Sequence, residues 1–184
     1  MKFSRKLVSV SFAVMLGLGA VSSFAQVVVG GASMLASKDI IDNAVTSKDH
    51  TTLVAALKAA GLVDTLKGAG PFTVFAPTNA AFAALPAGTV DTMLRLENKG
   101  MLMGILNNHV VPGRVDAAAL TKMIMDGKGS TTFKTVAGGM LTARSVGGKV
   151  MITDEKGGSS TVTIADLYQS NGVIHVVDKV LLPR

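Results

Sequence analysis

Three histidines, His50, His109 and His175, are the residues of this sequence best suited to acid–base or metal chemistry. They lie on separate predicted elements, and their spacing matches no common metal-ligand pattern. The chain has no cysteine, which excludes a thiol nucleophile. It also lacks the Gly-x-Ser-x-Gly, His-Glu-x-x-His and phosphate-loop motifs, and Gly127-Lys-Gly-Ser130 reads as a turn. We therefore predict no enzyme, no catalytic residue, no metal and no cofactor. A Ser-His-Asp set assembled from distant segments stays open as the least favoured alternative, a hydrolase.

Two of these histidines lie in apolar surroundings. His109 extends the apolar face of a predicted helix, and His175 lies inside the apolar run 173–177. A buried polar group needs a hydrogen-bond partner before it can do anything else. We favour a buried, hydrogen-bonded role for both residues over a ligand or catalytic role.

Methionine and acidic residues offer two further candidates for chemistry. Methionine thioethers bind soft metals such as Cu(I), but they also fill irregular gaps between helices, and we favour packing. Asp154-Glu155 is an acidic pair in a predicted hairpin turn, for which exposure to solvent is the simplest explanation. The methionines concerned are Met93, Met101, Met103, Met123 and Met125.

The N-terminus predicts the compartment. A basic start is followed by the uncharged, mostly apolar stretch 7–21 and by the small-residue segment Ser23-Phe24-Ala25. This order is typical of a secretory signal peptide, and the stretch is shorter than the ~20 residues of a membrane span. We predict a signal peptide over 1–25, cleaved after Ala25, a lead-in over 26–36 and one domain over 37–184. The protein would be secreted or periplasmic, with no membrane span after cleavage.

Charge argues against nucleic acid as a partner. The chain has 18 basic and 12 acidic residues, but three basic and no acidic residues lie in 1–25, which leaves a net charge of +3. Tryptophan is absent and there is one tyrosine, so platforms on which bases could stack are scarce. A mildly basic, solvated surface explains the composition.

Hydrophobic periodicity divides the remaining chain into a helical half and a strand-rich half. Glycine pairs at 138–139, 147–148 and 157–158 separate the later strands, as hairpin turns would. Ser37 is the predicted cap of the first helix, and Asp116 opens the last one. Predicted helices cover 39–45, 51–60, 62–66, 80–84, 89–94, 100–107 and a segment from 116, and predicted strands cover 72–76, 110–111, 131–136, 140–146, 149–153, 161–164 and 173–177.

Three segments carry a family resemblance. Thr73–Phe82 and Asn171–Pro183 resemble the paired signature boxes of the fasciclin (FAS1) domain, and Asn108–Gly113 resembles the family's central Tyr-His motif, with Asn108 in place of the common tyrosine. The similarity runs from about residue 39 to residue 183. It implies one α+β domain in which a helical half packs on a β-sandwich or wedge of short strands, in agreement with the periodicity.

The resemblance also supplies site residues. Most of the shared residues are expected to build the domain, and Thr78 or Asn79 is the expected cap of helix 80–84. In animal members an Asp-Ile pair before the second box is implicated in integrin binding, and Asp166 and Leu167 align with that pair. The alternative is that Asp166 caps a turn while Leu167 packs. The motif residues expected to be structural are Thr78, Asn79, His109, Pro112, Gly113, Asn171, Gly172 and His175.

The resemblance implies adhesion rather than catalysis. We predict a secreted bacterial adhesion or binding module that contacts a protein or glycan on cells or in the extracellular matrix. The lack of disulfides and of Asn-x-Ser/Thr sites suits a bacterial source. A carrier of an apolar pigment or lipid, with a groove in the methionine-rich helical half, is the alternative. The sequence leaves the partner and the oligomeric state open.

Overall fold

The computed structural model describes residues 27–184, so the predicted signal peptide lies outside the described residues. A small hairpin of β1 and β2 comes first, and the helices α1 to α6 follow with β3 among them. Then come β4 and α7, and the strands β5 to β9 come last. The helices are α1 (Ile40–Ala44), α2 (Thr51–Ala60), α3 (Val63–Lys67), α4 (Asn79–Ala83), α5 (Thr89–Met93), α6 (Lys99–Asn108) and α7 (Ala117–Asp126), with 3-10 turns η1 (Lys48–His50) and η2 (Leu96–Asn98). The strands are β1 (Val28–Val29), β2 (Ala32–Ser33), β3 (Phe72–Pro77), β4 (Val110–Pro112), β5 (Ser130–Lys134), β6 (Met140–Val146), β7 (Lys149–Thr153), β8 (Ser159–Gln169) and β9 (Gly172–Val177).

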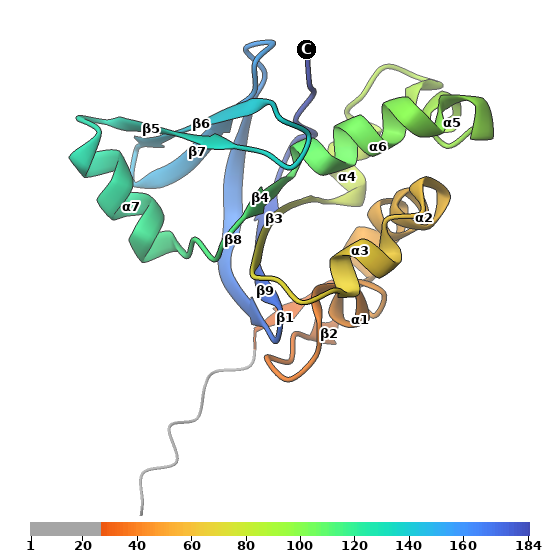
Figure 1. Cartoon of the computed structure of the whole chain (residues 1–184), viewed down its shortest axis with the longest axis horizontal. Coiled ribbons are helices and arrows are strands. Elements are labelled where there is room, and N and C mark those ends of the chain that lie inside the picture. Colours follow the sequence, from red (N-terminus) through yellow and green to blue (C-terminus); the bar gives the residue numbers. More distant parts are fainter. Residues whose placement is uncertain (1–26) are drawn as a thin grey trace, which may run out of the picture.

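Seven strands form one sheet in the order β4-β3-β9-β8-β7-β6-β5. Neighbouring strands are antiparallel except β3 and β9, which run parallel with Phe72 opposite Gly172 and Pro77 opposite Val177. These two strands lie in the two signature segments, so the residues that carry the family resemblance form a neighbouring pair of strands inside the sheet. The long strand β8 bends through two register shifts and carries the sheet from β9 across to the hairpin of β5, β6 and β7 (Figure 1).

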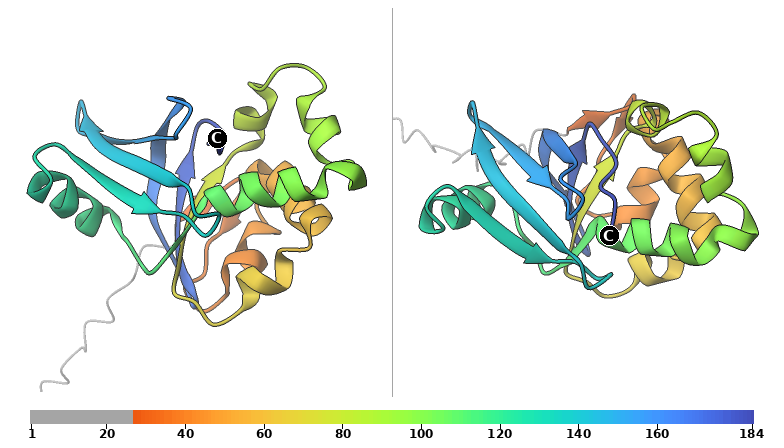
Figure 2. Two further views of the ribbon diagram at one scale, coloured as in Figure 1. Left: turned by 45° about the horizontal axis from the view of Figure 1, so that its top comes forward. Right: turned by 90° about the horizontal axis from the view of Figure 1, so that it is seen from above.

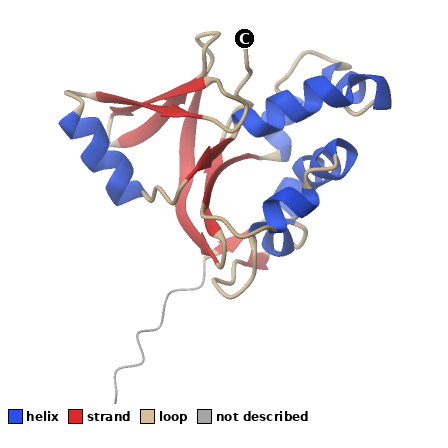
Figure 3. Cartoon of the chain, viewed as in Figure 1, coloured by secondary structure: helices blue, strands red, loops and turns tan. Residues whose placement is uncertain are grey.

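The bent sheet separates two layers of helix. Helices α1 to α6 gather on one side, and α7 lies alone on the other side beside β5 and β6 (Figures 2 and 3). Each side has its own apolar core. The larger core fills the space between α1–α6 and the sheet, and the smaller one lies between the two arms of the sheet under α7. Val177 and Leu181 belong to the smaller core and are fully buried.

The sheet curls far enough that its two outer strands approach each other. The amide of Val136, just after β5, donates to the carbonyl of Val110 in β4 at 2.8 Å. This bond satisfies backbone groups that an open edge would leave exposed. The sheet is therefore close to a barrel, which confirms the predicted α+β class and gives the wedge its shape.

Most predicted elements are present, with some corrections. Strands 140–146 and 149–153 have the predicted bounds, and Gly61 ends α2 in the left-handed conformation at φ 73°. The cap of α1 is Asp39 rather than Ser37, because the Asp39 carboxylate accepts from the Asp42 amide. The predicted strand 161–164 is too short, since β8 continues to Gln169. The predicted loose lead-in contains the β1–β2 hairpin.

Candidate binding face

A bulge in β8 presents Asp166. This residue has φ 60°, an unusual backbone conformation for any residue other than glycine, although aspartate tolerates it better than most. The register shift between Ile164 and Leu167 places Asp166 in a bulge opposite His175, and pairing with β9 resumes at Leu167. Its carboxylate accepts from the Ala117 amide at 2.7 Å, at the start of α7. Asp166 therefore ties the bulge to the N-terminal end of α7, while part of its side chain stays exposed.

Leu167 points the other way. It is 2% exposed and belongs to the larger core. The next residue, Tyr168, is 43% exposed, and its hydroxyl donates to the Asp116 carboxylate at 3.4 Å. The surface that a partner can reach here consists of Asp116, Asp166 and Tyr168, which we call the bulge face. Sequence reasoning named Asp116 only as a helix cap and did not identify Tyr168, because only the bulge brings them together.

The bulge face is acidic. Asp116 caps α7 by accepting from the Ala119 amide at 2.8 Å, as predicted. Two carboxylates thus lie at one helix N-terminus, where the helix dipole favours negative charge. Partial desolvation, followed by the charges of Asp166 and Asp116, raises the pKa of the Tyr168 phenol. The phenol therefore stays protonated and remains a hydrogen-bond donor at neutral pH.

His175 supports the bulge face from beneath. Its Nε2 donates to the Val115 carbonyl at 2.8 Å, and its Nδ1 accepts from the Asp166 amide at 3.4 Å. The ring also stacks on Phe75, with centroids 5.7 Å apart. Desolvation lowers the pKa of His175, so the ring is neutral and holds this pair of bonds. His175 positions the loop before α7 against the bulge.

His109 fastens the C-terminal segment. It is 1% exposed, its Nδ1 donates to the Ile105 carbonyl at 2.8 Å, and its Nε2 accepts from the Leu181 amide at 2.9 Å. Because one partner is a carbonyl and the other an amide, these bonds require the neutral ring. Desolvation lowers the pKa of His109 to about 4. Both ring nitrogens are engaged, so neither is free to act as a general base in this conformation.

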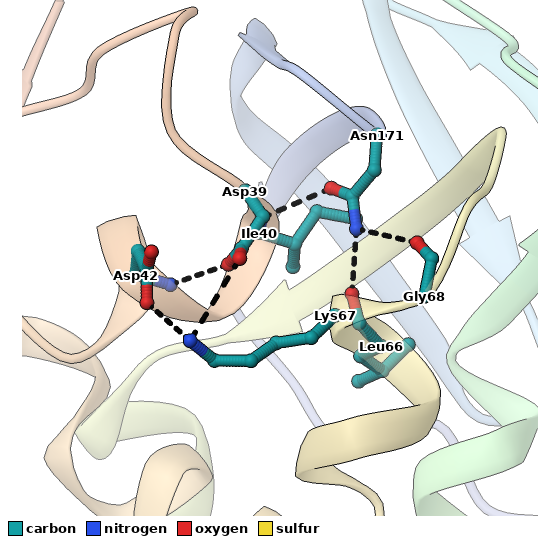
Figure 4. A network of polar contacts seen from close by, with 7 residues as sticks. All are labelled: Asp39, Ile40, Asp42, Leu66, Lys67, Gly68 and Asn171. Atoms are coloured by element: carbon teal, nitrogen blue, oxygen red, sulfur yellow. Dashed lines mark hydrogen bonds and ion pairs between the residues drawn. The ribbon is translucent and has the colours of Figure 1, made fainter.

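Asn171 joins three segments at the base of the domain. Its Oδ1 accepts from the Ile40 amide at 3.1 Å, and its Nδ2 donates to the carbonyls of Leu66 and Gly68 (Figure 4). Beside it, Lys67 pairs with Asp39 and Asp42 at the surface. Gly172 follows directly, and a Cβ there would lie 2.1 Å from the Phe72 carbonyl oxygen. At the start of the second signature segment, Asn171 thus holds α1 and the end of α3, and Gly172 allows the close approach of β3.

The remaining motif residues also contact backbone. Thr78 caps α4 by accepting from the Ala81 amide. Asn79 instead serves the neighbouring helix α2, since its Oδ1 accepts from the Thr52 amide at 3.0 Å and its Nδ2 donates to the Lys48 carbonyl. Pro112 is exposed at the end of β4, and Gly113 follows it at φ 97°.

Asp154 corrects the prediction of a solvated acidic pair. It is 6% exposed, and its carboxylate accepts from the amides of Lys156, Gly158 and Leu182. It therefore shapes the β7–β8 turn and holds the chain end beside the bond from His109. Glu155 is less buried and accepts from the Met140 amide.

The methionines do not form one cluster. Met93 is buried against the larger core, Met101 is exposed on α6, and Met123 and Met125 are exposed on α7, on the other side of the sheet (Figure 1). In the described part of the chain, no group of three or more His, Cys, Asp or Glu side chains is placed to hold a metal ion.

An apolar cavity of about 30 Å³ lies between the helices and the sheet. Drug-sized ligands occupy pockets of about 300–1,000 Å³, so a pigment or lipid would require this cavity to open widely. His50 lies in its wall. Ser47 contacts the Nδ1 of His50 at 3.0 Å, whereas the Nε2 has no hydrogen-bond partner within residues 27–184. Desolvation lowers the pKa of His50.

Comparisons with known proteins agree with the geometry. The Fasciclin domain family matches residues 48–183. Protein sll1483 of Synechocystis is 47% identical over 156 residues, which cover 85% of this chain and 79% of that protein. Immunogenic protein MPB70 of Mycobacterium bovis is 35% identical over 138 residues, 72% of this chain and 63% of that one.

A solved structure supports the fold independently. The FAS1 domain pair of the insect cell adhesion molecule Fasciclin I superposes with a TM-score of 0.70 at 19% identity, covering 79% of this chain and 51% of that chain. Within residues 27–184, no helix is both long and apolar enough to cross a membrane. The family match covers most of the chain and includes both central strands, so the chain belongs to the Fasciclin domain family, whose members include cell-adhesion proteins.

Proposed function

We propose that this protein is a secreted attachment module that binds a protein or glycan on a cell surface or in a matrix through the bulge face. Family membership supports a binding role, because Fasciclin domains are known as adhesion modules rather than enzymes. The bulge face is the feature of this chain on which the proposal rests. It combines an exposed aromatic ring, two carboxylates and a locally strained backbone.

The conformation of Asp166 is the observation that carries the proposal. A non-glycine residue at positive φ costs free energy, and such strain persists where surrounding contacts fix it, often at binding sites. Here the Ala117 amide and the His175 ring fix Asp166. A rigid, preorganised surface loses little conformational entropy when a partner binds. Tyrosine beside it supplies contact area with few rotatable bonds.

The buried position of Leu167 changes which residues a test must alter. Truncating a buried leucine to alanine costs about 2–5 kcal/mol, so Leu167→Ala would destabilise the domain and would confuse a loss of stability with a loss of binding. A role of Leu167 in partner binding is therefore indirect, through the shape of the bulge. Tyr168→Ser and Asp166→Asn alter the exposed surface, and asparagine tolerates positive φ as well as aspartate does.

The test measures saturable binding of the labelled protein to cells and to extracted surface polymers of the source organism. Leu96→Ser is a matched control, because Leu96 is 85% exposed on the opposite, helical side. We expect Tyr168→Ser to weaken binding at least tenfold and Leu96→Ser to leave it unchanged, with equal thermal midpoints. Binding that Leu96→Ser reduces as much as Tyr168→Ser would refute the bulge face. No saturable binding at micromolar protein would refute attachment to these surfaces.

A further inference from the structure

A pocket of about 330 Å³ opens beside the bulge face, where three connections meet at the base of the sheet. These are the α3–β3 connection, the β4–α7 loop and the β8–β9 turn. The pocket lies at the lower end of the volume range of small-ligand sites. Its wall combines the small residues Ala69 and Gly70 and the exposed ring of Pro71 with three polar side chains. The lining residues are Ala69, Gly70, Pro71, Arg114, Ser170 and Asn171.

Among the described residues, Arg114 supplies the only charged side chain that lines this pocket. A guanidinium has five N–H donors, and Arg114 uses one nitrogen to donate to the Gln169 carbonyl at 3.2 Å. This bond holds the side chain against the β8–β9 turn. Among residues 27–184, no carboxylate lies within 4.0 Å of Arg114 to form an ion pair. Most of its donors therefore face solvent.

The nearby acidic groups are already engaged. The Asp166 carboxylate accepts from Ala117, and the Asp116 carboxylate accepts from Ala119 and Tyr168. On the other side of the pocket, Ser170 donates its amide to the Lys38 carbonyl, and the Lys38 side chain is exposed. The Lys38 side chain does not line the pocket, so Arg114 is the cation that an anion would meet there, and that anion would not have to displace a carboxylate paired with the guanidinium.

We propose that this pocket binds the carboxylate of an acidic sugar, such as a uronic acid unit of a surface polysaccharide, through Arg114. A guanidinium binds a carboxylate with two parallel hydrogen bonds, which fixes both position and orientation. The pocket accommodates a single sugar ring, whose apolar C–H face packs on Pro71. The Ser170 hydroxyl is exposed and serves the sugar hydroxyls. This inference rests on the proposed attachment function and names the chemical class of its partner.

The single guanidinium on an open wall favours a repeating sugar over one protein terminus. Proteins usually capture a terminal carboxylate in a nest of free backbone N–H groups. At this rim the amides of Phe72, Gly113 and Ser170 already donate to the carbonyls of Asn171, Pro71 and Lys38. One guanidinium on an open wall gives weak single contacts instead, and a repeating polysaccharide multiplies such contacts through avidity.

The experiment titrates the ¹⁵N-labelled protein with hexagalacturonate, and with the same hexamer after its carboxyl groups are reduced. We expect amide shifts confined to residues 69–70, 113–114 and 169–171 for the acidic hexamer, and none for the reduced one. Arg114→Gln should weaken binding at least tenfold. The affinity of Arg114→Lys should lie between those of the unaltered protein and Arg114→Gln, because lysine keeps the charge but loses the paired hydrogen bonds. Arg144→Gln removes an exposed charge on β6 and should change nothing.

Several results would overturn the inference. Equal binding of the reduced hexamer would show that the carboxylate is not recognised. An equal loss of binding in Arg144→Gln would show that the effect comes from net charge rather than from Arg114. If a peptide with a free C-terminus bound more tightly, and in a way that depends on Arg114, the ligand of this pocket would be a protein terminus and not a sugar. Cell attachment that needs Tyr168 but not Arg114 would refute this pocket while leaving the attachment proposal standing. Hexamer binding through Arg114 without any cell attachment would support this pocket and refute the attachment proposal.

Discussion

His109 makes the stability of this domain depend on pH. Its ring bridges the end of α6 to the C-terminal segment through the Ile105 carbonyl and the Leu181 amide. Protonation would put an N–H on Nε2 and set it against the Leu181 N–H. The folded domain therefore binds a proton at His109 less readily than the unfolded chain does, and the free energy of unfolding falls as the pH decreases.

The magnitude follows from the pKa values. Burial lowers the pKa of His109 from 6.5 to about 4 in the folded state. The stability contributed by the neutral ring is complete above pH 6.5, decreases as the pH falls, and levels off below pH 4. The linkage relation gives a loss of about 2 kcal/mol at pH 5 and about 3 kcal/mol below pH 4. A domain of this size is stable by only about 5–15 kcal/mol, so the loss is a substantial share.

Urea unfolding at pH 7 and pH 5 measures this effect. His109→Gln does not titrate, and we expect it to lower stability at pH 7 by about 1–3 kcal/mol, because the Ile105 carbonyl loses its donor. Between pH 7 and pH 5 the free energy of unfolding of His109→Gln should then fall by about 2 kcal/mol less than that of the protein with His109 in place. Leu181→Ala is the control, since it opens a cavity at the same place without changing titration. If the unchanged protein and His109→Gln lose equal stability, the reasoning is refuted.

Three further substitutions test the backbone contacts of the signature segments. Asn171→Ala leaves one amide and two carbonyls without their partner and should cost about 2–4 kcal/mol in urea unfolding; a cost below 1 kcal/mol would contradict the network in Figure 4. Gly172→Ala drives a methyl group into the β3 backbone and should leave little folded protein by circular dichroism, whereas Gly104→Ala, in open space on α6, should stabilise by about 0.5–1 kcal/mol. Asn79→Ala should cost about 1 kcal/mol and speed hydrogen exchange in the first turn of α2, and exchange accelerated in α4 instead would show that the cap acts locally.

Local patterns in the sequence were enough to predict most of the fold. Strands β6 and β7 alternate and are bounded by glycine pairs, so their limits were predictable to the residue. The second half of β8 was not, because the bulge at Asp166 breaks the alternation that marks a strand. The first helix cap was assigned to Ser37 because serine and aspartate have similar propensities, and only the tertiary position of α1 selects Asp39.

The candidate site was less predictable than the fold. Family resemblance led to Asp166, but its bond to α7 joins residues 49 positions apart and leaves no local signal. The roles of Asn79 and Asp154 were missed for the same reason, since each serves a segment distant in the sequence. Arg114 follows an ordinary Pro-Gly turn, and nothing around it in the sequence marks a pocket.

The position of β9 has a consequence for how the protein is made. This strand is the last of the sheet in sequence, yet it lies between β3 and β8 and pairs residue 172 with residue 72. A growing chain therefore cannot complete the sheet until β9 has left the ribosome. Until then β3 and β8 lack a common neighbour, and the apolar residues of both cores stay exposed to water. Folding of the sheet is consequently postponed until residues 172–177 have been synthesised, so the two cores close late and together.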